Sequence, residues 1–136
     1  MKEKEIEQMQ AGYDLDALIY AEVFGKMAFR AEGRWEFTNE RDYLDKGEAY
    51  YLGEHQEIIR LPRYSTDMSA AYTVIEKLHE MGAWISISIL PNYKTWDVRG
   101  ILNERESNEI RFINHDESLP LAICRAALLA RQLELV

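Results

Sequence analysis

The sequence is poor in cysteine and has no excess of positive charge. Cys124 is the single cysteine among 136 residues, so the chain cannot form an internal disulfide or a thiolate metal cluster. The formal net charge is −8, from 24 acidic and 16 basic residues. A protein that binds duplex nucleic acid needs a basic surface to displace counterions, so the composition disfavours duplex DNA or RNA as a partner.

Long hydrophobic runs and flexible linkers are also lacking. No segment approaches the roughly 20 apolar residues of a membrane span, and the first ten residues are charged rather than hydrophobic. The three prolines and seven glycines are scattered and form no linker. We therefore expect a single domain over residues 1–136, located in the cytoplasm, without a membrane partner and long enough to bury a sizeable core.

Helical periodicity marks three segments. The first begins near Asp14, a good N-cap residue, and ends at Gly25. The second runs from about Asp67 to Met81, where Asp67 supplies negative charge at the N-terminus. The third follows Ser118 and is apolar on more than one side. It is therefore expected to pack either between the sheet and another helix or between subunits.

Strand periodicity is clearest in the second half of the chain. Residues 83–90, 95–102 and 109–115 alternate apolar and polar side chains and are joined by short turns, which predicts an antiparallel meander. Residues 27–61 are less regular and predict short strands and loops. Together the elements predict an α+β fold, an antiparallel sheet with helices packed on both faces as an α/β/α sandwich.

The loop before the second helix is the first candidate site. It contains Arg60, Arg63, Tyr64, Ser65 and Thr66. Backbone N–H groups at a helix start attract anions, and arginines add bidentate hydrogen bonds, so a phosphate is a suitable ligand. The tyrosine ring offers a surface on which a base can stack. The alternative is an ordinary helix cap with solvated arginines, because the acidic N-cap residue already supplies the negative charge.

A second candidate lies on the predicted meander. Alternation places Trp84, Arg99 and Arg111 on one face of the sheet with the two serines of the first strand, where they are candidates for an anion pocket. The alternative is a solvated face with cross-strand ion pairs such as Asp97 with Arg111. Trp84, Trp35 and Trp96 are candidates for stacking on a base, or for filling the core or an interface.

Patterns typical of catalysis or metal binding are missing. The sequence has no nucleophile elbow, no glycine-rich phosphate loop and no histidines at ligand spacing. Cys124 lies within the apolar last helix and is expected to be inert packing. We therefore expect no catalytic residues, no metal and no cofactor.

Three segments resemble the signature blocks of the phage ABA-sandwich domain proteins. They are DLDALIYAEVFG (14–25), LPRYSTDMSAAYTVIEKL (61–78) and LPLAICRAALLA (119–130), in the family's order and spread over most of the chain. Tyr72 departs from the pattern, where relatives more often have tryptophan, and residues 27–60 have no clear counterpart. The resemblance implies helices on both sides of a β-sheet and an origin in phages or prophages of Gram-positive bacteria. It implies no established catalytic activity.

The resemblance and the candidate sites lead to a functional hypothesis. The protein is expected to act in the host cytoplasm as a homo-oligomer that binds and sequesters a nucleotide-derived small-molecule signal of host antiphage defence, without catalysis. One alternative is a protein-interaction module that inhibits or adapts a host or phage protein through its acidic surface. Another is a small hydrolase of the same signal.

Overall fold

The computed structural model describes residues 2–30, 33–34 and 49–134. Its described helices are α1 (Glu3–Gln8), α2 (Tyr13–Glu22), α4 (Met68–Glu80) and α5 (Leu119–Glu134). The described strands are β1 (Phe29–Arg30), β2 (Gly33–Arg34), β3 (Tyr50–Leu52), β4 (Ile58–Arg60), β5 (Trp84–Ile89), β6 (Trp96–Leu102) and β7 (Ile110–Asp116). Much of the segment 27–61, for which short strands and loops were predicted, lies outside the described residues, including Trp35.

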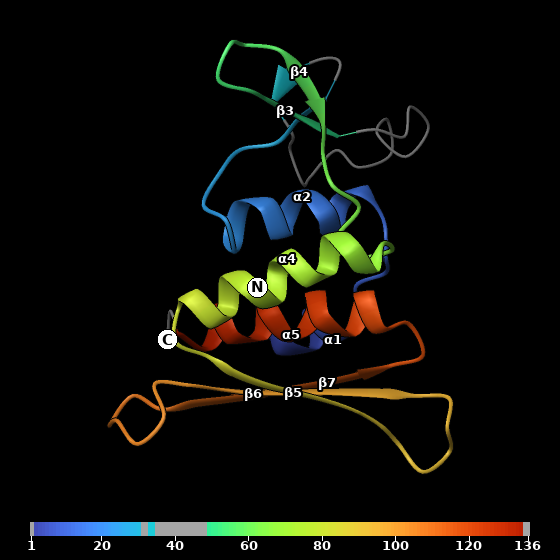
Figure 1. The fold of residues 1–136 in the computed structure, drawn as a ribbon, viewed down its shortest axis with the longest axis vertical. Coiled ribbons are helices and arrows are strands. Elements are labelled where there is room, and N and C mark those ends of the chain that lie inside the picture. Colours follow the sequence, from blue (N-terminus) through green and yellow to red (C-terminus); the bar gives the residue numbers. More distant parts are fainter. Residues whose placement is uncertain (1, 31–32, 35–48, 135–136) are drawn as a thin grey trace.

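The strands form two antiparallel sheets with the helices between them. The main sheet has the order β5-β6-β7, and the second has the order β2-β1-β3-β4. Figure 1 shows α5 and α1 next to the main sheet, followed by α4 and α2 and then by the β3–β4 hairpin. The helix α5 contacts β6 and β7, whereas α4 contacts β5 and α5.

This arrangement confirms the α+β class and changes the predicted layers. The described helices all lie on one face of the main sheet, so the expectation of helices on both faces is not confirmed (Figure 1). The physical reason is the alternation of the strands. Their buried apolar side chains point to the face that the helices cover, whereas the opposite face carries most of the polar and charged side chains.

The helix α4 begins and ends where its sequence signals predict. The Asp67 side chain accepts a hydrogen bond from the Ser69 N–H at 3.1 Å, which makes Asp67 the N-cap. After the helix, Gly82 adopts a φ of +95°, a left-handed conformation that favours glycine. Ala71, Val74 and Leu78 are buried on the inner side of the helix.

The helix α2 begins differently from the prediction. Its N-cap is Gly12 rather than Asp14, and the Gly12 N–H donates a hydrogen bond to Ser65 Oγ at 2.9 Å. The prediction was wrong because the hydrogen-bond acceptor at this helix start comes from a loop 53 residues away. Gly25 follows the helix with a φ of +68°, as the sequence indicated.

The helix α5 is the centre of the core. Residues 121–130 are buried without exception. The helix lies between the main sheet and the other helices, so the first of its two predicted environments is confirmed. Arg125 is buried with them, and its guanidinium donates to Met9 O at 2.6 and 2.9 Å and to Asp116 Oδ1 at 3.2 Å. This side chain joins the N-terminal segment to the end of β7.

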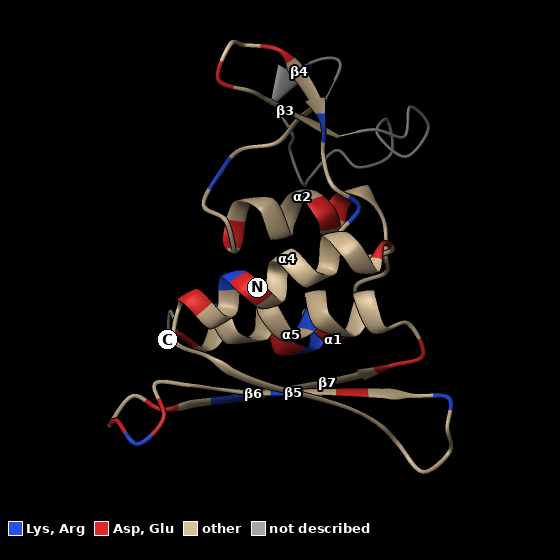
Figure 2. Cartoon of the chain, in the orientation of Figure 1, with Lys and Arg blue, Asp and Glu red and all other residues tan. Residues whose placement is uncertain are grey.

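Charged residues are spread unevenly over the elements. Figure 2 shows them on the helices, at turns and on β6 and β7, while β5 carries none. None of the helices in the described ranges is long and apolar enough to cross a lipid bilayer.

A tight contact between two strands gives the first prediction. A Cβ atom at Gly100 on β6 would overlap the ring of Phe112 on β7. We expect Gly100→Ala to lower the free energy of unfolding by about 1–3 kcal/mol, the usual cost of overpacking. Urea denaturation of the two proteins measures the difference.

A smaller side chain at position 112 provides the matched control. Phe112→Leu relieves the overlap, so Gly100→Ala in the Phe112→Leu background is expected to cost much less than Gly100→Ala alone. Equal costs in the two backgrounds would contradict the proposed contact.

Candidate functional site

The loop from Arg60 to Thr66 is partly buried. Tyr64 lies in the core, where its ring stacks on Phe24 with the centroids 5.4 Å apart. Burial raises the pKa of the Tyr64 phenol above its ordinary value of 10.0. Ser65 is fully buried, whereas Arg60, Arg63 and Thr66 are exposed. The predicted members of this site therefore do not share one surface.

Ser65 connects the loop to α2 through Asp16. The Ser65 hydroxyl donates to Asp16 Oδ1 at 2.7 Å, and its backbone N–H donates to the same oxygen at 2.8 Å. Arg63 Nε lies 3.5 Å from Asp16 Oδ2, and the guanidinium lies over the ring of Tyr13 at 4.4 Å. The loop therefore caps α4 through Asp67, as the alternative interpretation has it, but Arg63 is paired with Asp16 and Tyr13 rather than only solvated.

The second candidate site is assembled on the main sheet. Because side chains alternate along each strand, the pairing of β5, β6 and β7 places nine residues on the face away from the helices, which we call the open face. They form three cross-strand rows: Trp84, Ile101 and Arg111; Ser86, Arg99 and Ile113; Ser88, Asp97 and His115. The predicted grouping of Trp84, Arg99 and Arg111 with the two serines is confirmed.

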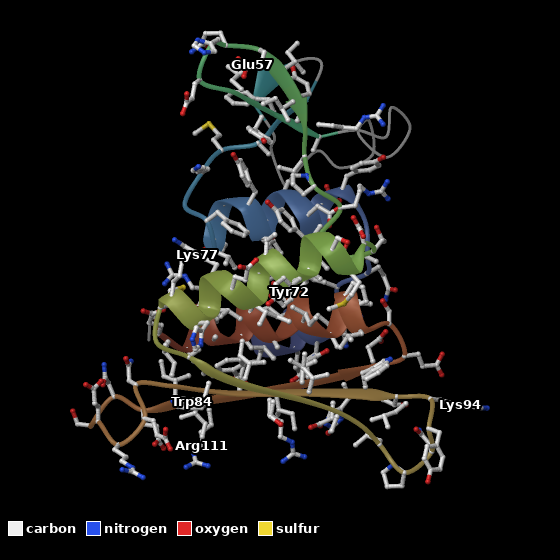
Figure 3. The ribbon with its side chains drawn as sticks, in the orientation of Figure 1. Glu57, Tyr72, Lys77, Trp84, Lys94 and Arg111 are labelled. Atoms are coloured by element: carbon white, nitrogen blue, oxygen red, sulfur yellow. The ribbon has the colours of Figure 1, made fainter. Side chains whose placement is uncertain are left out.

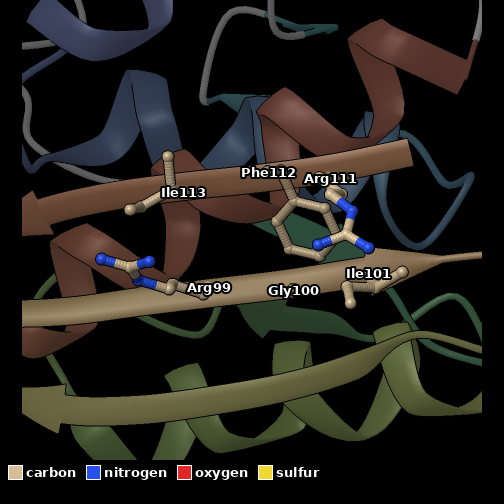
Figure 4. A pocket seen from close by; sticks show the side chains of 6 residues that line it. All are labelled: Arg99, Gly100, Ile101, Arg111, Phe112 and Ile113. Carbon is tan, nitrogen blue, oxygen red and sulfur yellow. The ribbon is translucent and has the colours of Figure 1, made fainter. Parts of the chain in front are cut away.

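Two rows of the open face enclose a shallow hollow. Its volume is about 260 Å³, and its side-chain corners are Arg99, Ile101, Arg111 and Ile113 (Figure 4). The register places Arg99 opposite Ile113 and Ile101 opposite Arg111, so the two arginines occupy diagonal corners. Figure 3 shows Arg111 and Trp84 projecting from the sheet on the side away from the helices.

A carboxylate accepts a hydrogen bond from the Nε atom of each arginine. Arg99 Nε donates to Asp97 Oδ2 at 2.7 Å, and Arg111 Nε donates to Glu109 Oε2 at 3.1 Å. Hydrogen bonds from the Arg105 N–H and from Arg111 lower the pKa of the Glu109 carboxyl. Since both contacts use Nε, the terminal N–H groups of the guanidiniums have no acceptor among the described residues and can reach a bound ligand.

Asp97 does not pair with the residue that was predicted as its partner. The prediction of a pair with Arg111 was wrong, because the register sets Asp97 opposite His115 and Arg111 opposite Ile101. His115 Nε2 lies 2.6 Å from Asp97 Oδ1, so the buried carboxylate lies between a histidine and Arg99. The lengths of the strands and of the turn joining them were the signal that could have identified His115.

A second hollow lies at the edge of the main sheet. This edge hollow has a volume of about 510 Å³. Figure 3 labels Tyr72 on α4 and Trp84 on β5, which border it. Ile75, Glu76, His79, Glu80 and Ile85 complete its lining.

Metal-ligating and reactive side chains form no further site among the residues that the structure describes. Within the described ranges no group of three or more histidine, cysteine, aspartate or glutamate side chains could hold a metal ion. Cys124 is fully buried, and burial raises the pKa of its thiol, which keeps the thiolate population low.

The buried Asp16 carboxylate gives a prediction about pH. Burial raises its pKa above the ordinary value of 3.8, and the hydrogen bonds from Ser65 and the charge of Arg63 only partly oppose this. Folded Asp16 therefore keeps its proton to a higher pH than unfolded Asp16, and its contribution to stability falls as the pH rises through and above 3.8. Each unit by which the pKa is raised corresponds to about 1.4 kcal/mol.

Asp16→Asn removes this titration and retains an oxygen that accepts from Ser65. We expect the free energy of unfolding of the natural protein, minus that of Asp16→Asn, to decrease as the pH rises from about 3.8 toward neutrality. Urea denaturation at a series of pH values measures it. A difference that increases with pH would mean that the ion pair with Arg63 outweighs burial.

Comparison with known proteins supports the family suggested by the three segments, although the match covers only the last four residues of the first segment. No curated protein and no solved structure matches this chain. The family model described as the phage ABA sandwich domain matches residues 22–128, which include the whole of α4, the main sheet and most of α5. The chain belongs to the phage ABA sandwich domain family.

Proposed function

We propose that this protein binds a nucleotide-derived small molecule on its open face and sequesters it without chemical change. The observation that carries the proposal is the hollow between Arg99 and Arg111, with an exposed tryptophan nearby. Its volume of about 260 Å³ suits a phosphate with an attached sugar, and larger parts of the ligand would extend over the sheet.

The arginines favour a phosphorylated ligand. Guanidinium groups form bidentate, charge-assisted hydrogen bonds with phosphate, and here two of them approach one hollow from opposite corners. Hydrogen bonds from their Nε atoms to Asp97 and Glu109 hold the two side chains in place, which reduces the side-chain entropy lost on binding. A ligand with a pyrophosphate or two separate phosphates would engage both arginines.

Trp84, in the first row of the open face, favours a ligand that contains a nucleobase. Trp84 is 68% exposed and lies opposite Ile101, which itself borders the hollow. An indole ring at this place offers a stacking surface for a nucleobase, while the phosphates lie between the arginines. The two kinds of contact together select a nucleotide over a simple anion.

The family and this chemistry support a proposal for the biological role. Phage proteins act inside an infected host, and nucleotide-derived molecules are signals that such a host can use in defence. A protein that binds the signal tightly lowers its free concentration in proportion to the number of binding sites. The proposed mechanism is therefore stoichiometric depletion.

A protein-interaction module is the second candidate function. The open face exposes Trp84 and Ile113, and Tyr93 is exposed on the turn between β5 and β6. Exposed aromatic and aliphatic side chains near arginines are typical of the central residues of protein interfaces. A single stoichiometric protein partner recovered from host lysate would support this second function.

Native mass spectrometry tests the proposed ligand site. The purified protein is incubated with a panel of nucleotide signals and with an extract of infected cells, and bound masses are recorded before and after denaturation. We expect an adduct that is released intact. Because a hydrogen bond to a charged group contributes about 1.5–3 kcal/mol, Arg99→Ala and Arg111→Ala are each expected to weaken binding by about tenfold or more.

Arg105→Ala is the matched control. Arg105 is an exposed arginine on the turn between β6 and β7, and its loss changes the net charge equally without altering the hollow. An equal loss of affinity in all three variants would indicate a nonspecific charge effect and contradict the site. Release of a chemically altered ligand, with more than one turnover per chain, would indicate a hydrolase instead.

A further inference from the structure

The edge of β5 has none of the usual protection of an exposed strand. Within the described part of the chain β5 pairs with β6 alone, so its other edge presents unpaired backbone groups. Proteins usually protect such an edge with charged residues, proline or a bulge. The six residues of β5, WISISI, contain no charge, no proline and no glycine (Figure 2). The other edge strand, β7, carries Arg111, His115 and Asp116.

Apolar side chains project at this edge on the side of the helices. Ile87 is 37% exposed and Ile89 is 43% exposed, although both point to the face of the sheet that the helices cover. Ile85 points the same way, is partly buried and lines the edge hollow. The end of β5 at Ile89 therefore presents a projection, its exposed isoleucine side chains. The end at Ile85 borders a depression, the edge hollow.

We propose that a second copy of this chain pairs with β5 through its own β5, antiparallel, about a two-fold axis at Ile87. Residues opposite each other in a sheet must point to the same face, so the axis has to pass through a residue position. Centred on Ile87, the register sets Ile87 opposite its own copy, Ile85 opposite Ile89 and Ser86 opposite Ser88. Isoleucines then face isoleucines, and serines face serines.

This register brings the projection of each copy to the depression of the other. Ile89 of the second copy lies beside Ile85, at the edge hollow lined by Tyr72 and Ile75 of α4. The volume of the hollow, about 510 Å³, is ample for an isoleucine side chain. An interface in which one surface supplies both complementary parts is self-complementary, as two-fold symmetry requires.

Charge complementarity also favours a second copy. Glu76 and Glu80 border the edge hollow, close to the start of β5, and Lys94 lies on the turn that follows the end of β5. Antiparallel pairing sets the end of one β5 beside the start of the other, so the turn that carries Lys94 lies at the same end of the pair as Glu76 and Glu80 of the partner, where Glu80 already pairs with Lys77 at 3.5 Å. The product is a continuous six-stranded sheet.

The oligomeric state of the full chain tests the proposal. We expect a dimer by sedimentation at micromolar concentration, and we expect Ile87→Lys to halve the measured mass to that of one chain, 15.9 kDa. Ile113→Lys is the matched control, because Ile113 is similarly exposed, at 41%, but lies on β7. Circular dichroism confirms that both variants are folded. A monomeric natural protein, or a dimer that Ile87→Lys leaves intact, would overturn the proposal.

Cysteine cross-linking tests the register. Residues opposite each other in antiparallel strands have Cα atoms about 4.5–5.5 Å apart, within the range of a disulfide. Ile87→Cys is therefore expected to form a disulfide-linked dimer on oxidation, whereas two copies of Ile85→Cys would lie about 13 Å apart and remain unlinked. The native Cys124 is buried and does not interfere. Linkage of Ile85→Cys without Ile87→Cys would overturn the register.

Dimer formation and ligand binding are separable. The arginines of the open face lie on β6 and β7, away from the paired edge, whereas Trp84 lies on β5 itself, so the arginines are the residues that separate the two proposals. Arg99→Ala is therefore expected to remain dimeric, and failure of the ligand proposal leaves the dimer proposal unaffected.

Discussion

The structure depends on the burial of residues 121–130 of α5. Ten consecutive residues of this helix are inaccessible, and every other large element of the described chain packs against it or against a neighbour that does. Alanines at four of these positions allow close approach, and Arg125, the one buried cation among the described residues, is satisfied by a backbone carbonyl and a carboxylate. Because α5 occupies one face of the main sheet with the help of α4, the opposite face remains available for function.

Local sequence patterns predicted the helices and strands. Features that depend on contacts between residues distant in the sequence were not predicted. The main strands and α4 follow strong periodicity and a side-chain cap, so they were predicted to within two residues. The alternation of β5, β6 and β7 also predicted that Trp84, Arg99 and Arg111 share a face. The N-cap of α2 depends on Ser65, and the burial of Tyr64 depends on Phe24, and neither partner is visible in a local pattern.

The main sheet combines two different surfaces. Its open face has paired charges that hold arginines in place around a shallow hollow, which suits recognition of a small polar molecule. The β5 edge has unpaired backbone groups, no charged side chains and exposed isoleucines, which suits a strand from another chain. Both surfaces come from one short meander, so the proposed ligand contacts of Arg99 and Arg111 and the proposed strand pairing of β5 can change independently, with Trp84 as the residue common to both regions.

The contact between Arg125 and Met9 has a consequence for biosynthesis. It joins residues separated by 116 positions, and α5 is the last helix of the described chain. During translation the N-terminal helices leave the ribosome before α5 has been made, so they lack the helix that packs against them until that point. Their native packing therefore forms only after α5 has left the ribosome, and these long-range contacts are expected to slow folding.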